Sequence, residues 1–182
     1  MKVIILAAGQ GTRLRPLTND RPKCMVEYKN KPLINYILET IKECNINDIV
    51  IVNGYKKKVL EKYLENENLI FSTNEDFGST NMVSTLFCAK DFMDDDLIIS
   101  YADIIYKKDI LLELIKSEKE FSVVVDRNWK ELWSLRMENP LDDAETLIMD
   151  ESKNLTEIGQ KTSDINKVQS QYIHPIDPAL CV

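Results

Sequence analysis

The chain has 182 residues, 44% of them hydrophobic and 29% charged, a composition typical of a globular protein and a length that fits one domain. The net charge of −7 argues against nucleic acid as the main partner, and no apolar run reaches the length of a membrane span. Four cysteines without a C-x-x-C pair and a single histidine indicate neither a zinc site nor a disulfide framework. Because the N-terminus lacks the composition of a signal peptide, we expect a cytoplasmic protein.

The first predicted strand, residues 3–6, runs directly into a loop of small residues. Two glycines, Gly9 and Gly11, allow backbone angles that side chains forbid, so that backbone N–H groups can approach an anion. Between Gly9 and Lys31 the chain carries six basic and two acidic side chains, a local charge of +4 against −11 for the remainder. A basic loop on an acidic chain is suited to a small phosphorylated ligand.

Two common phosphate-binding motifs do not fit this stretch. The Walker pattern G-x-x-x-x-G-K-[ST] is absent, and a dinucleotide fingerprint requires a third glycine where Leu14 stands. The fingerprint also opens a helix at once, whereas Pro16 and Pro22 keep this segment irregular. A dinucleotide-dependent oxidoreductase is therefore disfavoured.

Apolar segments of two periods alternate along the following hundred residues. Helical spacing predicts helices over residues 33–41, 56–64, 82–87 and 110–115. Continuous apolar runs predict strands over residues 48–52, 69–71, 97–101 and 121–125. Strands that alternate with helices indicate an α/β fold with a doubly wound, mainly parallel sheet.

The alternation ends after Asp126. Residues 127–143 are interpreted as an inserted active-site segment, strands are predicted over residues 146–149 and 155–158, and a further strand begins near residue 169. No repeat or linker is present, so we expect one domain over residues 1–173, followed by a non-native or disordered tail over residues 174–182.

Asp103 is the residue that we expect to bind a metal ion. It stands directly after the predicted strand 97–101, and ligands of open α/β sheets gather at the carboxyl ends of the strands. A short carboxylate also suits the octahedral oxygen coordination of Mg²⁺. The alternative interpretation is an aspartate that caps a turn or helix.

The opening stretch resembles the signature of the nucleotidyltransferases that activate sugar phosphates and phosphocholine, L-A-A-G-x-G-T-R-L-x-P-L-T followed by P-K. The signature runs without a break over residues 6–18, and Pro22 and Lys23 follow. The resemblance implies a Rossmann-like sheet of the nucleotide-diphospho-sugar transferase type. It also implies transfer of a nucleotidyl group to a phosphorylated acceptor, release of pyrophosphate, and Mg²⁺ as the cofactor.

The same resemblance implies roles for the nucleotide side of the site. Arg13 would hold the β- and γ-phosphates, Lys23 would lie at the reacting phosphates, and Asp103 would bind magnesium. Nucleotide-binding residues would come from the signature and from the loop before the helix at residues 82–87: Leu6, Ala7, Ala8, Gly9, Gly11, Thr12, Thr80, Asn81 and Ser84. Helix capping alone would explain one of the last three.

For the acceptor, residues 157–161 are similar to a family segment of the E-K-P type without its proline, which implies that Lys161 meets the acceptor phosphate. Asp126 and Trp129 are further candidates, and with Trp133 an aromatic pair could enclose a quaternary ammonium group. Ordinary packing of the two indoles is the alternative.

Three segments, residues 22–28, 80–85 and 133–146, resemble the cytidylyltransferase branch of the family, in particular the enzymes that act on phosphoglutamine. This resemblance implies CTP and a small phosphorylated metabolite as substrates and a role in capsule polysaccharide. We also expect that the protein can form a homo-oligomer. Family members are longer, so we expect a truncated chain without a second metal-binding aspartate. The alternatives are a sugar-1-phosphate transferase that uses UTP or dTTP, and a nucleotide-binding remnant without turnover.

Overall fold

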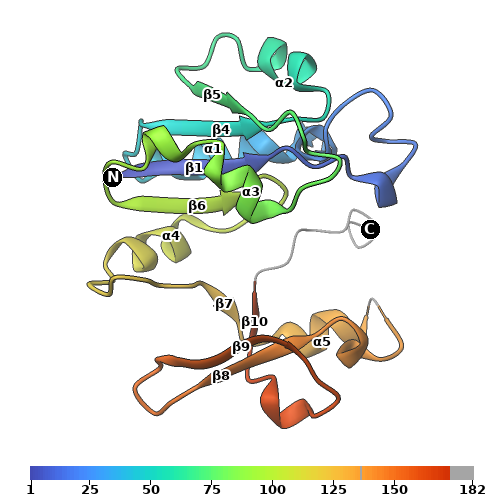
Figure 1. Ribbon diagram of the computed structural model, residues 1–182, viewed down its shortest axis with the longest axis vertical. Coiled ribbons are helices and arrows are strands. Elements are labelled where there is room, and N and C mark those ends of the chain that lie inside the picture. Colours follow the sequence, from blue (N-terminus) through green and yellow to red (C-terminus); the bar gives the residue numbers. More distant parts are fainter. Residues whose placement is uncertain (136, 173–182) are drawn as a thin grey trace. The chain divides into compact units, whose positions relative to one another are not determined.

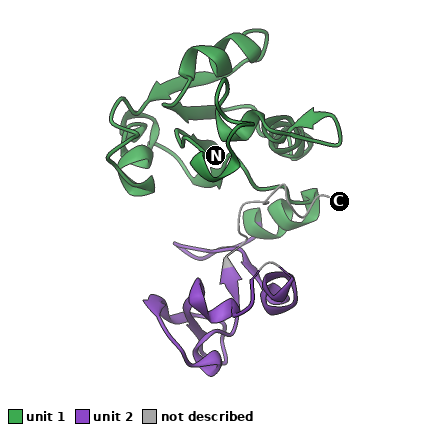
Figure 2. Ribbon diagram, turned by 90° about the vertical axis from the view of Figure 1, so that its right-hand side faces the viewer, with its two compact units in different colours: residues 1–115, 175–181 green, residues 116–174, 182 purple. Residues whose placement is uncertain are grey.

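A computed structural model describes residues 1–135 and 137–172, and these form two compact units (Figures 1 and 2). The first unit comprises residues 1–115 and the second begins at Lys116. The sequence had predicted one domain over residues 1–173, and the predicted tail, residues 174–182, lies outside the described residues. No helix in the described part of the chain has the length and apolar character needed to cross a membrane.

A four-stranded parallel sheet forms the centre of the first unit. The strands lie in the order β5-β4-β1-β6 (Figure 1), and neighbouring members pair in parallel throughout. Their bounds are Lys2–Ala7 for β1, Ile49–Asn53 for β4, Ile70–Thr73 for β5 and Leu97–Tyr101 for β6. In this register Leu6 lies beside Val52 and Tyr101, so the loops after three strands leave the same edge of the sheet.

Helices cover both faces of this sheet. Alternate residues of β1 point to opposite faces, so Val3 and Ile5 join the core beneath α1, whereas Ile4 and Leu6 join the core beneath α3. Leu60 of α2 and Leu111 of α4 belong to the α1 side. The helix bounds are Leu33–Glu43 for α1, Lys57–Tyr63 for α2, Met82–Phe87 for α3 and Lys108–Ile115 for α4. The predicted doubly wound α/β fold is therefore confirmed.

Short elements complete the first unit. Two 3-10 turns, η1 and η2, interrupt the loop after β1, a small antiparallel pair precedes α1, and a third turn, η3, precedes β6. The bounds are Thr12–Leu14 for η1, Lys23–Met25 for η2, Glu27–Tyr28 for β2, Lys31–Pro32 for β3 and Lys90–Phe92 for η3. Pro32 is the N-cap residue of α1, which follows from its fixed φ and missing N–H.

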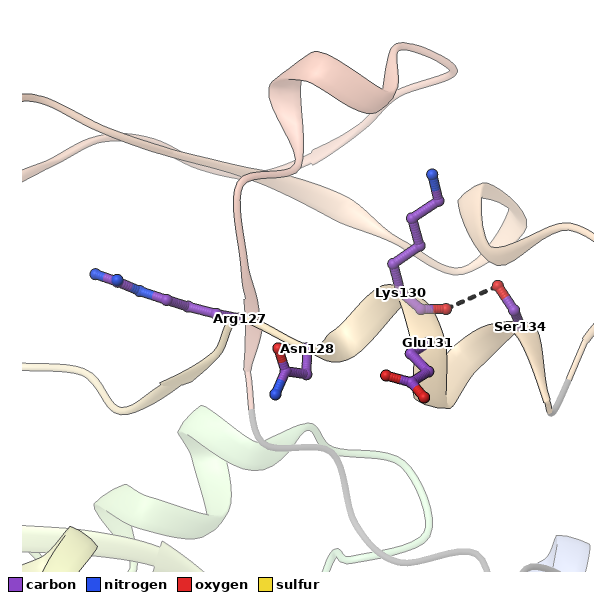
Figure 3. A pocket seen from close by; sticks show the side chains of 5 residues that line it. All are labelled: Arg127, Asn128, Lys130, Glu131 and Ser134. Carbon is purple, nitrogen blue, oxygen red and sulfur yellow. Dashed lines mark hydrogen bonds between the residues drawn. The ribbon is translucent and has the colours of Figure 1, made fainter.

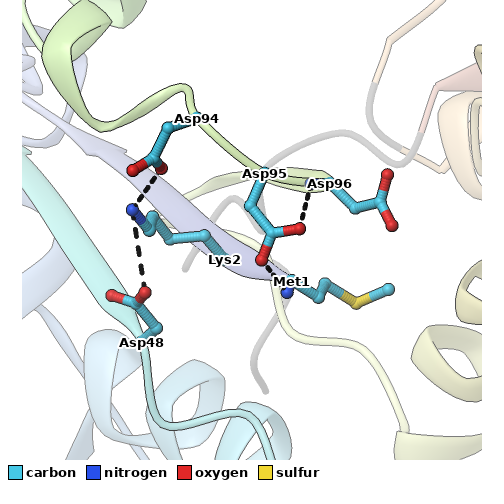
Figure 4. A network of polar contacts seen from close by, with 6 residues as sticks. All are labelled: Met1, Lys2, Asp48, Asp94, Asp95 and Asp96. Atoms are coloured by element: carbon cyan, nitrogen blue, oxygen red, sulfur yellow. Dashed lines mark hydrogen bonds and ion pairs between the residues drawn. The ribbon is translucent and has the colours of Figure 1, made fainter.

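Charged groups fix the start of β1 to two neighbouring loops (Figure 4). The Lys2 ammonium lies 2.6 Å from a carboxylate oxygen of Asp94 and 3.7 Å from one of Asp48, and the Met1 amine pairs with Asp95. These partners lower the pKa of Asp94 and Asp95 and raise the pKa of Lys2 and of the amine, in each case mainly through the side-chain hydrogen bond. The acidic run before β6 therefore has a structural role.

The second unit contains short antiparallel pairs around a small core. Strands β8 and β9 form a hairpin, β7 pairs with β10, and α5 carries Trp129 and Trp133 into a core with Ala144 and Val168. The bounds are Val125–Asp126 for β7, Trp129–Ser134 for α5, Pro140–Asp142 for η4, Glu145–Met149 for β8, Leu155–Lys161 for β9, Ile165–Lys167 for η5 and Gln171–Tyr172 for β10.

One strand prediction was largely wrong. Residues 121–125 have the β-branched composition of a buried strand, yet only Val125 enters one, and Phe121 is 79% exposed. A strand requires a partner, and in the described part of the chain β10 pairs only with Val125 and Asp126.

Candidate functional site

The loop after β1 is held in a compact form by Gly11. This residue has a left-handed φ of 62° and precedes η1 as its N-cap. A Cβ atom at this position would lie 2.9 Å from the Cβ of Lys23, too close for a side chain. Gly11 and Lys23, twelve positions apart in the signature, are therefore packed against each other.

Lys23 and Asp103 meet at the carboxyl edge of the sheet. The Lys23 ammonium lies 2.6 Å from a carboxylate oxygen of Asp103, and the two side chains are only 21% and 16% exposed. Asp103 follows the end of β6, as the sequence predicted, whereas Lys23 begins η2. A cation therefore already faces the carboxylate that was predicted to bind a metal ion.

The buried surroundings of this ion pair keep neighbouring groups neutral. Burial, with a smaller contribution from the charge of Asp103, raises the pKa of the Cys24 thiol to about 12. Burial and the same carboxylate also raise the pKa of Tyr101. Cys24 therefore fills space beneath the loop and supplies no thiolate.

The other basic side chains of the loop divide into two kinds. The side chains of Arg13 and Arg15 are exposed and make no hydrogen bond or ion pair with any residue that the structure describes. Arg21 instead pairs with its neighbour Asp20 at 3.0 Å. Arg13 thus retains its five N–H donors for a ligand.

The loop before α3, which was predicted to read a base, is built around Asn74. The Asn74 amide donates hydrogen bonds of 2.9 Å to the hydroxyl groups of Thr80 and Thr85. Thr80 donates in turn to the Asp76 carbonyl at 2.9 Å, so its hydroxyl is engaged within the loop. The sequence analysis missed Asn74, which carries no motif and is recognisable only by its burial.

Asn81 is the N-cap residue of α3. Its side-chain oxygen accepts hydrogen bonds from the backbone N–H of Ser84, at 3.0 Å, and from the Ser84 hydroxyl, at 3.3 Å. Of Thr80, Asn81 and Ser84, helix capping therefore explains Asn81. Both side chains are exposed, and a base-reading role for them, as for Thr80, stays a prediction.

Among the residues that the structure describes, no three His, Cys, Asp or Glu side chains converge as a metal cluster. One carboxylate is nevertheless sufficient for magnesium, which commonly binds through one or two carboxylates together with substrate phosphates and water. Asp103, whose oxygen already lies against an ammonium group, has the donor chemistry for an ion that arrives with a nucleotide.

In the second unit the two predicted cage tryptophans form its core. Their rings meet edge to face with centroids 5.5 Å apart, and Trp129 and Trp133 are 3% and 2% exposed. An aromatic cage needs open ring faces, so the arrangement matches the alternative, ordinary packing. No contact that the structure shows brings Trp129 to a ligand-binding surface, and its acceptor-binding role stays a prediction.

The remaining acceptor candidates are exposed or structural. Lys161 ends β9, is 66% exposed and lies 4.0 Å from a carboxylate oxygen of Asp143. Asp126 accepts a hydrogen bond of 2.8 Å from the backbone N–H of Asn128, which turns the chain into α5. The buried Gln171, which the sequence analysis missed, pairs with Asp126 and donates to the Glu145 carbonyl.

A hollow of about 420 Å³ lies along α5 (Figure 3). Asn128 and Glu131 point to the same side of the helix, whereas Lys130 points to the other side, and the Ser134 hydroxyl donates to the Lys130 carbonyl at 2.7 Å. Arg127 and Glu131 line the hollow without an ion-pair partner in the described part of the chain. The side chains that line the hollow thus include both signs of charge.

A family model described as "Nucleotidyl transferase" matches residues 2–131. This chain belongs to that family. The matched range contains the whole signature loop, the Lys23–Asp103 pair and the loop before α3. The predicted family is therefore confirmed.

Relatives within the family include cytidylyltransferases. The chain is 49% identical, over 95% of its length, to the CTP:phosphoglutamine cytidylyltransferase of Campylobacter jejuni, of which the match spans 71%. It is 25% identical to the solved CTP:phosphocholine cytidylyltransferase of Streptococcus pneumoniae, with a TM-score of 0.63, 93% of this chain covered and 65% of the other.

A third likeness concerns the fold alone. The inositol-1-phosphate CTP transferase of T. maritima superposes with a TM-score of 0.75 at 20% identity, over 94% of this chain and 67% of the other. The chain thus spans about two thirds of the length of these two solved proteins.

Proposed function

We propose that this protein transfers a cytidylyl group from CTP to a small phosphorylated acceptor, such as phosphoglutamine or a phosphocholine-like compound, and releases pyrophosphate. The observation that carries the proposal is the Lys23–Asp103 pair beside the glycine loop, in a chain 49% identical to a CTP:phosphoglutamine cytidylyltransferase. We further propose that the reaction occurs in the cytoplasm and that its product serves the modification of capsule or other surface polysaccharide.

The transfer needs positioning and charge stabilisation, and no covalent intermediate. Backbone N–H groups of the loop after β1 would hold the nucleotide, and the unpaired Arg13 guanidinium would hold the β- and γ-phosphates in the bidentate geometry that arginine prefers. Lys23 would turn from Asp103 toward the reacting phosphates, where its positive charge stabilises the transition state.

Asp103 would hold Mg²⁺ together with the phosphates of CTP. The ion, when bound, would neutralise charge that develops on the leaving pyrophosphate. Asp103 itself would fix the position of the metal ion at the carboxyl end of β6.

The acceptor would bind to the second unit. Lys161 is the candidate for its phosphate, and Asp126 and Trp129, on either side of the turn into α5, are the further candidates for acceptor binding. Arg127 and Glu131, which have no ion-pair partner among the described residues, suit a group that carries both charges, as the amino-acid end of phosphoglutamine does.

The test is pyrophosphate release with each nucleoside triphosphate and Mg²⁺, offered against phosphoglutamine, phosphocholine and hexose 1-phosphates. We expect release with CTP and one of the first two acceptors. Asp103→Asn should abolish it, while Asp91→Asn, the same change at an exposed aspartate outside the site, should not.

Other outcomes of this panel identify the rival functions. Release with UTP or dTTP and a hexose 1-phosphate would replace the proposal by a sugar-1-phosphate nucleotidyltransferase. Silence across the panel together with calorimetric binding of CTP would identify a nucleotide-binding protein without turnover.

A further inference from the structure

Tyr55, which lies outside the signature, contacts the signature loop at three points. It follows β4, and its hydroxyl donates to the carbonyls of Thr18, at 3.0 Å, and Asn19, at 3.2 Å. Its backbone N–H donates to the carbonyl of Ala8 at 3.1 Å. Tyr55 thus binds the signature loop near its beginning, at Ala8, and near its end, at Thr18 and Asn19.

The backbone beneath this contact is tightly packed. A Cβ atom at Gly54 would lie 3.0 Å from both the Cβ and the carbonyl oxygen of Ala8. Only glycine therefore lets the chain before Tyr55 approach the loop this closely.

Thr18 transmits the contact from Tyr55 to the ion pair. Its side chain is fully buried, and its hydroxyl donates to the Gly11 carbonyl at 2.9 Å. Gly11 lies in turn against the side chain of Lys23. A continuous set of contacts thus joins the Tyr55 hydroxyl through Thr18 and Gly11 to the pair of Lys23 and Asp103.

The ring of Tyr55 contacts the second loop of the nucleotide side. It meets the ring of Phe77 with centroids 6.0 Å apart and an interplanar angle of 66°. Phe77 directly precedes Gly78, where the loop before α3 comes within 3.7 Å of Gln10, measured from an ideal Cβ on the glycine. Tyr55 therefore packs against one loop while its hydroxyl holds the other.

A loop that binds an anion through N–H groups must keep its carbonyl oxygens away from that anion. The carbonyls of Gly11, Thr18 and Asn19 each accept a hydrogen bond from within the protein, two of them from Tyr55. Without the Tyr55 hydroxyl, two carbonyl dipoles lose the donor that orients them.

We infer that Tyr55 is a positioning residue for the nucleotide phosphates: its hydroxyl fixes the signature loop in the form that binds them. The inference rests on the proposed function, because it concerns how the same loop binds CTP. The hydroxyl orients Thr18 and Asn19 without contacting the phosphates.

The test compares two tyrosine-to-phenylalanine variants. Tyr55→Phe removes the hydroxyl and keeps the ring, and Tyr36→Phe does the same in α1, where the hydroxyl donates to the Tyr28 carbonyl at 2.8 Å away from the signature loop. We expect calorimetry with CTP and Mg²⁺ to show an affinity about tenfold lower for Tyr55→Phe, the size of one lost hydrogen bond. We expect Tyr36→Phe to stay within about twofold of the wild type.

A merely structural role would predict a different pattern. It predicts equal losses of thermal stability and affinity in the two variants, whereas the inference predicts a raised KM for CTP in Tyr55→Phe with the KM for the acceptor unchanged. Equal CTP affinities of the two variants would overturn the inference and leave the proposed function intact. A wild-type protein that binds no CTP would overturn both.

A second pair of variants applies if Tyr55→Phe does not fold. Thr18→Val removes the hydroxyl that donates to Gly11 and keeps the shape of the side chain, whereas Thr18→Ser keeps the hydroxyl. We expect Thr18→Val to weaken CTP binding and Thr18→Ser to restore most of it. Equal affinities of these two variants would also overturn the inference.

Discussion

The two units of this protein differ in how their candidate site residues are held. In the first unit, the Lys23 side chain lies against Gly11 on one side and pairs with Asp103 on the other. In the second unit, Lys161 is exposed and Trp129 is part of the core. The long signature and a strand end therefore identified residues that do meet, whereas a short segment and a pair of indoles identified residues whose surroundings do not by themselves indicate a ligand.

The largest expected effect concerns the core of the second unit. Trp129→Ala should destabilise this unit by about 3–5 kcal/mol, because it leaves a cavity beside Trp133. Hydrogen exchange of β8 measures the effect, with Leu132→Ala, 41% exposed on the same helix, as the matched control. Unchanged hydrogen exchange in Trp129→Ala together with weaker acceptor binding would instead show that Trp129 binds the acceptor, as the cage interpretation predicted. The candidate residues of both units would then contact a ligand.

The second prediction concerns the packing of the signature loop. Gly11→Ala should lower the free energy of unfolding by about 1–3 kcal/mol, because a side chain there is strained at positive φ and collides with Lys23. Gly9→Ala should change that free energy by less than about 0.5 kcal/mol, since nothing lies within 4 Å of its added Cβ. Urea unfolding compares the two, and equal midpoints would contradict the packing described for the loop.

The third prediction concerns competition for Asp103. The Lys23 ammonium pairs with the carboxylate that would bind the metal ion. Lys23→Ala should therefore raise the affinity for Mn²⁺, measured without nucleotide, by about fivefold, a change that corresponds to the free energy of one ion pair. Electron paramagnetic resonance of free Mn²⁺ measures this. Lys31→Ala, which removes the exposed partner of Glu39, is the control, and equal affinities in the two variants would show that Lys23 does not compete.

The smallest effect concerns the network at the start of β1. Asp95 has a pKa below 3.8 in the folded state, so its pairing stabilises the protein above that value and the gain is lost as the pH falls through the lowered pKa. The Met1 amine has a pKa above 8.0, so its gain is present below 8.0 and is lost as the pH rises through the raised pKa.

The difference in Tm between the wild type and Asp95→Asn should therefore be greatest in the neutral range and shrink toward both acid and alkaline pH. Salt should also reduce it, because these groups are exposed. A difference that does not vary with pH would show that Asp95 acts through its hydrogen bond to the backbone of Asp96 rather than through charge.

The comparison also explains what could be predicted from the sequence. Strand β1, a polar cap before α3 and the place of Asp103 after β6 follow from local patterns, namely continuous apolar residues, polar residues before a helix and a strand end, whereas the choice of Asn81 as the cap comes from the structure. Tyr55 was missed because its role depends on Thr18 and Asn19, which are distant in the chain, and Asn74 was missed because no motif marks it. Residues 121–124 were predicted to belong to a strand and do not, because a strand depends on pairing with a partner elsewhere in the chain.

The contact between Gly11 and Lys23 has an evolutionary consequence. A larger residue at position 11 would demand a smaller one at position 23, but a smaller one would lose the charge that meets Asp103. Neither position can compensate for a change in the other. We therefore expect selection to act against single substitutions at either position.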